Sequence, residues 1–208
     1  MSENNLVGYI DDEDIHFDNY KTRLLRDGIQ LIKAPVLYAM GDFVSWVLKQ
    51  KIKFLIVDFK LSNKYSFSGA DFVAYINSML PDLPCLILTN YTQASIDKKL
   101  VSKNFVKDRD ILANPDISEF INQIKDEITI FDNRIKNHLI EFGNLHRKRE
   151  GKRISAVEEE RYLNLYALLR TYGEVDEIPT ELLQSQFEEK IDLVIQQLDK
   201  IIHATDKE

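Results

Sequence analysis

Phe54-Leu55-Ile56-Val57-Asp58 joins four apolar residues directly to a carboxylate. An apolar run this short, with β-branched residues, predicts a strand buried on both faces, as in a parallel sheet covered by helices. Asp58 then falls at the carboxyl end of that strand. In open α/β sheets, ligands bind at the carboxyl ends of the strands. Asp58 is therefore the first candidate for a functional residue.

Four further short apolar segments share this character, and amphipathic helical patterns separate all five. The sequence predicts strands at residues 6–10, 29–32, 54–58, 85–89 and 105–107. Strands that alternate with helices indicate a parallel sheet, and right-handed crossovers place the helices on both of its faces. The predicted fold class is therefore α/β, with a doubly wound, five-stranded parallel sheet.

After Pro115 the chain changes to a purely helical pattern. Large apolar residues recur at steps of three and four and form a heptad-like seam: Ile121, Ile124, Ile128, Phe131 and Ile135. The seam predicts a helix from about residue 116, roughly 30 residues and about 45 Å long. We assign residues 1–125 to a first domain that includes the start of this helix. Residues 126–208 are assigned to an all-α, coiled-coil-like extension.

The apolar seam is too large for an exposed surface. Either the helices of the tail fold back over it or a second chain covers it, and we expect a homodimer through the long helix. Further helices are predicted at residues 155–172, with Gly173 as the C-cap, and around residues 187–202. The basic segment at residues 146–153 is either a solvated turn between helices or a binding surface for an acidic partner.

The composition excludes several classes of protein. The chain has 208 residues and a formal net charge of -7, which argues against a general nucleic-acid binder, so DNA is not an expected partner. The single cysteine, Cys85, excludes a disulfide framework and a cysteine-rich zinc site. No apolar run is long enough for a membrane span, and the N-terminus lacks the pattern of a signal peptide. We therefore expect a cytoplasmic protein.

Polar residues from four strand ends meet at one edge of the predicted sheet: Asp11, Asp12, Asp58, Thr89 and Lys107. Three converging carboxylates repel one another and favour a bound cation. Oxygen ligands alone suit a hard ion such as Mg²⁺. A carboxylate can also attack phosphorus to form an aspartyl phosphate, which a cation and a hydroxyl donor stabilise. Each of these residue types fits such a site.

Residues 5 to about 125 resemble the receiver domain of two-component response regulators. The resemblance rests on an acidic pair after the first strand, Asp58 after the third, Thr89 after the fourth and Lys107 after the fifth. It implies that Asp58 accepts a phosphoryl group from a sensor histidine kinase or a phosphotransfer protein. It also implies that Thr89 and Lys107 contact that group.

The resemblance further implies a Mg²⁺ site. Its ligands are Asp11, Asp12, Asp58 and the main-chain carbonyl of Lys60. Departures from the family's pattern include the longer loop after Asp58, with its glycine at Gly69, and Asp108 rather than proline after Lys107. Asn90 also follows Thr89, and Asn104 stands where the family usually has an aromatic residue.

Three functions are open at this point. The protein is a phosphorylation-controlled signalling module whose helical region acts on an unidentified downstream protein, or it is a phosphate sink or phosphorelay intermediate. The third reading, a Mg²⁺-dependent phosphohydrolase, needs a general acid–base residue besides the nucleophile, and no histidine near Asp58 in the sequence supplies one. We therefore expect a phosphoacceptor that is not an enzyme beyond its own phosphotransfer and dephosphorylation.

Overall fold

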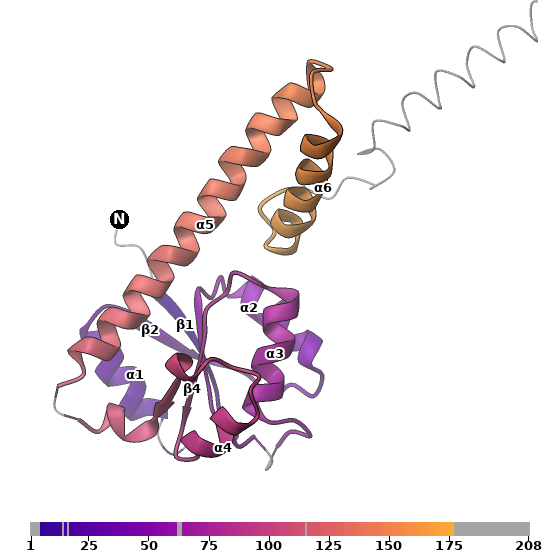
Figure 1. Ribbon diagram of the computed structural model, residues 1–208. Helices are drawn as coiled ribbons and strands as arrows, with labels where there is room; N and C mark the ends of the chain where they lie inside the picture. Colours follow the sequence, from indigo (N-terminus) through magenta and orange to yellow (C-terminus); the bar gives the residue numbers. More distant parts are fainter. Residues whose placement is uncertain (1–4, 14, 16, 62–63, 115, 177–208) are drawn as a thin grey trace, which may run out of the picture. The chain divides into compact units, whose positions relative to one another are not determined.

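The computed structural model describes residues 5–13, 15, 17–61, 64–114 and 116–176. Within them, five strands alternate with helices in the predicted order (Figure 1). The strands are β1 (Asn5–Ile10), β2 (Ile29–Lys33), β3 (Phe54–Val57), β4 (Cys85–Thr89) and β5 (Val106–Asp108). The helices are α1 (Phe17–Arg26), α2 (Met40–Lys49), α3 (Gly69–Met79), α4 (Thr92–Asp97), α5 (Ser118–Glu150) and α6 (Ala156–Thr171).

All neighbouring strands of the sheet pair in parallel, in the order β2-β1-β3-β4-β5. This strand order is that of flavodoxin-like doubly wound folds, so the predicted fold class is confirmed. Every residue of β3 is buried, as expected for a central strand with helices on both faces. The register places Ile10 opposite Val57, so β1 and β3 end level with each other.

Helices cover both faces of the sheet. Figure 1 shows α1 and the beginning of α5 on one face, and α2 and α3 on the other. A core cluster on the first face joins Leu24 of α1 and Ile124 of α5 to Phe54 of β3. On the second face, Phe43 of α2 contacts Phe72 of α3, with ring centroids 5.0 Å apart. These contacts hold the strand ends in fixed positions.

The fifth strand begins one residue later than predicted. Lys103–Phe105 forms a 3₁₀ turn (η1), in which the N–H of Phe105 donates to the carbonyl of Ser102 at 2.9 Å. A second 3₁₀ turn, η2 (Arg109–Leu112), follows β5 directly. The Asp108 side chain caps η2 by accepting from the N–H of Asp110. The chain therefore turns back toward the sheet edge immediately after three strand residues.

Helix α5 has 33 residues, close to the predicted length. Its seam residues Ile121, Ile124 and Ile128 belong to the core cluster of the sheet, which confirms that the first part of the helix packs there. Further along α5, Asp132 forms an ion pair with Lys53, the residue before β3, at 2.6 Å. The chain separates into two compact units between Glu141 and Phe142, later than the sequence-based domain boundary after residue 125.

The second unit has a small core of its own. Phe142 of α5 stacks on Tyr162 of α6, with ring centroids 4.8 Å apart, and Leu165 lies in the same cluster. Ser155 begins α6 with a capping box that involves Glu158. Helix α6 thus agrees with the predicted helix at residues 155–172, and Gly173 follows it with a positive φ of 72°.

Two cations of the basic segment are paired within the chain. Lys148 contacts Glu158, and Arg149 contacts Glu159 at 3.0 Å. These pairs favour the reading of the segment as an interhelical turn. The predicted final helix around residues 187–202 lies outside the described residues. In the part of the chain that the structure describes, none of the helices combines the length and apolar character of a membrane span.

Candidate functional site

The carboxyl ends of three adjacent strands assemble a buried polar site. Asp11 and Asp12 follow β1, Asp58 follows β3, and Thr89 ends β4. The N–H of Asp58 donates to the carbonyl of Ile10 at 2.8 Å, which extends the parallel ladder by one residue and places Asp58 beside Asp11. All four polar residues are buried. The structure thus brings together four of the five strand-end residues singled out from the sequence.

The three carboxylates lie close enough to share one cation. One oxygen from each of Asp11, Asp12 and Asp58 lies within 4.8 Å of the other two. Carboxylate oxygens are the ligands that Mg²⁺ prefers in proteins, so the donor set fits that ion. Lys60 is exposed, and its side-chain ammonium lies 5.5 Å from the ring centroid of Tyr91. Its main-chain carbonyl stays a predicted ligand.

Asp58 has an unusual electrostatic environment for an aspartate. Burial raises the pKa of Asp58 to about 6, and the negative charge of Asp11 acts in the same direction. The Arg109 guanidinium, the Thr89 hydroxyl and the N–H of Phe59 oppose this shift of the pKa. At neutral pH most of the population is still ionised, so Asp58 carries the lone pair that a nucleophile needs.

Asp11 is held by three separate donors. The hydroxyl of Tyr9 donates to its Oδ2 at 2.5 Å, and the N–H of Glu13 donates to its Oδ1 at 2.8 Å. Arg109 donates to Oδ2 at 3.0 Å. Burial raises the pKa of Tyr9, with Asp11 as a further cause, so this phenol stays protonated and remains a donor. Asp11 is therefore fixed in orientation before any ligand binds.

Arg109, which the sequence did not single out, contacts two of the three carboxylates. Its Nη2 lies 2.9 Å from Oδ1 of Asp58 and 3.0 Å from Oδ2 of Asp11. Lys107 pairs with Leu88 in the register of β4 and β5, and among the described residues no hydrogen bond or ion pair joins Lys107 to Asp58. Arg109 lies just beyond the end of β5, in the 3₁₀ turn η2, where strand alternation in the sequence gives no signal for it.

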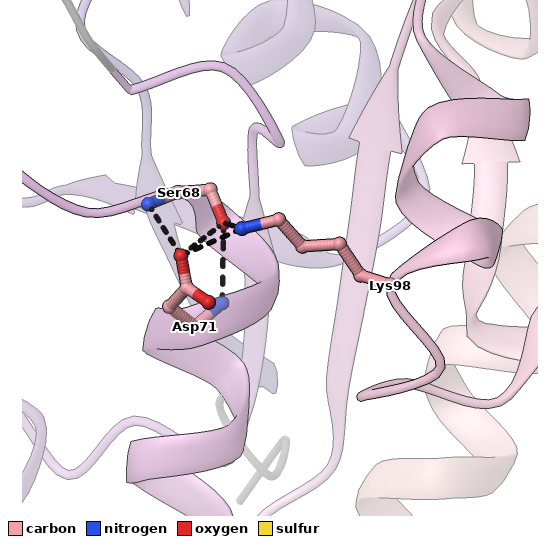
Figure 2. A network of polar contacts seen from close by, with 3 residues as sticks. All are labelled: Ser68, Asp71 and Lys98. Carbon is pink, nitrogen blue, oxygen red and sulfur yellow. Dashed lines mark hydrogen bonds and ion pairs between the residues drawn. The ribbon is translucent and has the colours of Figure 1, made fainter.

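The loop between β3 and α3 is tied down next to the site. Ser68 and Asp71 form a capping box at the start of α3, and the Lys98 ammonium joins both side chains, at 2.7 Å and 2.8 Å (Figure 2). The hydrogen bonds from Lys98 and Ser68 lower the pKa of Asp71 to about 2. The same ammonium lies 5.9 Å from the ring centroid of Phe59. The end of α4 is thereby connected to the residue after Asp58.

Comparisons with known proteins give one kind of match. No protein-family model matches the chain, and no curated protein does. The solved structures similar to it include the signal receiver domain of an HD domain-containing protein from Pseudomonas fluorescens Pf-5, with 13% identity and a TM-score of 0.49. That similarity covers 64% of this chain and 93% of the other.

Two further matches are receiver domains as well. The receiver domain of the Francisella response regulator 1452 has 16% identity and a TM-score of 0.47, over 61% of this chain and 98% of the other. A CheY-like response regulator receiver domain protein from Methanospirillum hungatei JF-1 has 12% identity and a TM-score of 0.48, over 64% and 99%. All three of these solved structures are described as receiver domains.

Proposed function

We propose that the protein is a phosphoacceptor of a two-component system and that Asp58 is the residue that takes the phosphoryl group. The observation that carries the proposal is the position of Asp58: a buried, ionisable carboxylate at a strand end, clustered with Asp11 and Asp12 and hydrogen-bonded to Thr89. Structural ion pairs also bury aspartates, but three carboxylates around one point indicate a site for a cation and a reacting group.

The transfer itself is a displacement at phosphorus. A carboxylate oxygen of Asp58 attacks the phosphorus of a phosphohistidine on a sensor histidine kinase or phosphotransfer protein. The new P–O bond forms as the P–N bond breaks. The electron pair of the P–N bond leaves with the imidazole nitrogen. We assign Thr89 to hydrogen-bond the incoming phosphoryl oxygens, and the contact of its hydroxyl with Asp58 supports this role. We assign Lys107 to charge neutralisation of the same group.

Asp11, Asp12 and Asp58, with the main-chain carbonyl of Lys60, would hold Mg²⁺. When bound, this ion offsets the negative charge of the phosphoryl oxygens during the transfer. The fixed orientation of Asp11 supports this assignment, because its contacts with Tyr9 and Glu13 do not involve Asp58. In this proposal Asp58 serves both as a ligand and as the nucleophile.

The helical region would carry the output. Helix α5 begins in the core of the sheet and continues beyond Glu141, so its residues belong to both compact units. We infer that phosphorylation changes how this region binds an unidentified downstream protein or a second copy of the chain. Ile130 and Ile140 of α5 are exposed, which offers apolar contacts for such a homodimer.

A phosphate sink or relay intermediate is the second candidate, in which the helical region only docks or dimerises. Sedimentation velocity with and without beryllofluoride and Mg²⁺ separates the two. A change in assembly or shape on addition of beryllofluoride supports the switch, whereas binding without any such change supports the sink.

The phosphoacceptor proposal is tested by beryllofluoride binding, because this compound mimics a phosphoryl group on an aspartate. Wild-type protein with Mg²⁺ is expected to unfold at a higher temperature in its presence. Asp58→Asn should lose this shift, and Asp42→Asn, which changes an exposed aspartate of α2, should keep it. An equal shift in Asp58→Asn would contradict the proposal. Release of phosphate from phosphate esters that persists in Asp58→Asn would point to a site other than Asp58.

A further inference from the structure

Arg109 occupies the space between two of the three carboxylates. Its Nη2 contacts Asp58 and Asp11 at 2.9 Å and 3.0 Å, and only 11% of its side-chain surface is exposed. The backbone delivers it there because η2 starts at Arg109, directly after the Asp108 cap. One nitrogen atom of one residue therefore links the proposed phosphoacceptor to its acidic neighbour.

We propose that Arg109 is a built-in competitor for the cation site: it neutralises Asp58 and Asp11 in the resting protein and must release them before a divalent cation binds. The inference rests on the proposed function in one respect, namely that the carboxylate cluster is a divalent-cation site. It adds a residue that controls how tightly the cluster takes that cation.

A guanidinium and a divalent cation seek the same carboxylate oxygens, and both are positively charged. Asp11 and Asp58 are buried, so water does little to screen the repulsion between two cations placed there. Binding of the divalent cation therefore includes the cost of displacing Arg109. In return, Arg109 offsets the repulsion between Asp11 and Asp58 when no metal is bound.

A second observation indicates that the resting contacts of Arg109 are incomplete. Its Nε is buried and finds no acceptor among the described residues. A buried donor without a partner is destabilising, so the guanidinium is held less firmly than its two ion pairs alone would imply. An arginine also presents several donors in a planar fork, which lets it exchange one set of acceptors for another. These features suit a residue that moves.

The test measures Mg²⁺ affinity by isothermal titration calorimetry on the full chain, without any phosphodonor. Arg109→Gln is expected to bind Mg²⁺ on the order of tenfold more tightly than the wild type, because a competing cation is gone. Lys49→Gln removes the same charge at an exposed position of α2 and should change the affinity less than about twofold, because a solvent-screened surface charge contributes little. A merely structural role of Arg109 predicts the opposite sign, a weaker site in Arg109→Gln. Weaker or unchanged Mg²⁺ binding in this variant overturns the inference.

Arg109→Lys is a second variant that keeps the test valid if Arg109→Gln fails to fold. It keeps the charge and offers a single ammonium, so its Mg²⁺ affinity should fall between those of the wild type and Arg109→Gln. An affinity outside that interval counts against the inference. The proposed function can fail separately: if Arg109→Gln binds Mg²⁺ more tightly while phosphoryl incorporation does not depend on Asp58, the role of Arg109 stands and the phosphoacceptor proposal does not.

Discussion

Gly69 lies against the main-chain carbonyl of Asp58 so closely that a Cβ atom at Gly69 would be 2.0 Å from that oxygen. The N–H of Gly69 also donates to the carbonyl of Phe59 at 2.8 Å. The start of α3 is thus packed directly on the backbone of the proposed acceptor. The glycine is required here by space, since no positive φ is recorded for it.

Gly69→Ala should therefore destabilise the protein and displace Asp58. Overpacking against backbone that cannot move aside costs about 1–3 kcal/mol, and thermal unfolding followed by circular dichroism measures it. Gly143→Ala is the matched control, because a Cβ there meets nothing within 4 Å and the helical propensity of alanine should stabilise α5 by up to about 1 kcal/mol. If both alanine variants unfold at the same temperature, the close approach of Gly69 to Asp58 does not affect the stability of the protein.

The sequence was sufficient for the fold and for most of the site. Short apolar runs that alternate with helical patterns have few solutions other than a doubly wound parallel sheet. That topology collects every strand end at one edge, so Asp11, Asp12, Asp58 and Thr89 could be grouped before their contacts were known. The apolar seam of α5 could also be predicted, because its large apolar residues, Ile124 among them, are spaced at a helical period.

Arg109 could not be predicted in the same way. Its place depends on β5 ending after three residues and on the 3₁₀ turn capped by Asp108, and neither has a strong signature in the sequence. The resemblance to receiver domains pointed to Lys107 as the cation of the site. In the structure, the residue that contacts Asp58 is Arg109, two residues further along the chain. The beginning of the fifth strand shifted for a similar local reason, the turn that includes Phe105.

Thr89→Ala should slow phosphorylation of Asp58 more than it weakens the fold. The Thr89 hydroxyl contacts Asp58 and also accepts from the N–H of Tyr91 at 3.2 Å. Loss of one such hydrogen-bond donor typically costs on the order of 10²-fold in rate. The measurement is the rate of phosphoryl incorporation from acetyl phosphate. Thr89→Ser, which keeps the hydroxyl, should recover most of the rate, and failure of serine to do better than alanine would show that the hydroxyl is not the active feature.

The stability of the protein should depend on pH through Asp58 in a defined direction. Its pKa is raised from 3.8 to about 6 in the folded state, chiefly by burial. Between these values the folded protein binds more protons than the unfolded chain, so stability falls as pH rises through this window. Without divalent cations at about pH 7.5, Asp58→Asn should therefore be more stable than the wild type, by on the order of 2 kcal/mol.

This advantage of Asp58→Asn should disappear as the pH is lowered toward about 4, where the wild-type carboxyl is protonated. Urea denaturation of both proteins at a series of pH values measures this difference in the free energy of unfolding. Asp42→Asn, at an exposed position, serves as the control and should show no comparable pH dependence. An Asp58→Asn variant that is less stable than the wild type at neutral pH would mean that Arg109 and Thr89 more than compensate for the burial of the charge.

The network of Ser68, Asp71 and Lys98 should contribute modestly to stability (Figure 2). Lys98 and Asp71 are more than one-third exposed, so a double-mutant cycle with Lys98→Ala and Asp71→Ala should give a coupling of about 0.2–1 kcal/mol. High salt should reduce it. A coupling free energy of zero at low salt would show that this contact does not stabilise the link between α4 and the loop after Asp58.

The central claim is that Asp58 takes the phosphoryl group, and the mass of the intact protein after incubation with acetyl phosphate and Mg²⁺ tests it most directly. The wild type should gain the mass of one phosphoryl group, and the label should be lost when Mg²⁺ is chelated beforehand. Asp58→Asn should gain nothing, while Asp42→Asn should match the wild type. Phosphoryl incorporation into Asp58→Asn at the level of the wild type would contradict the account.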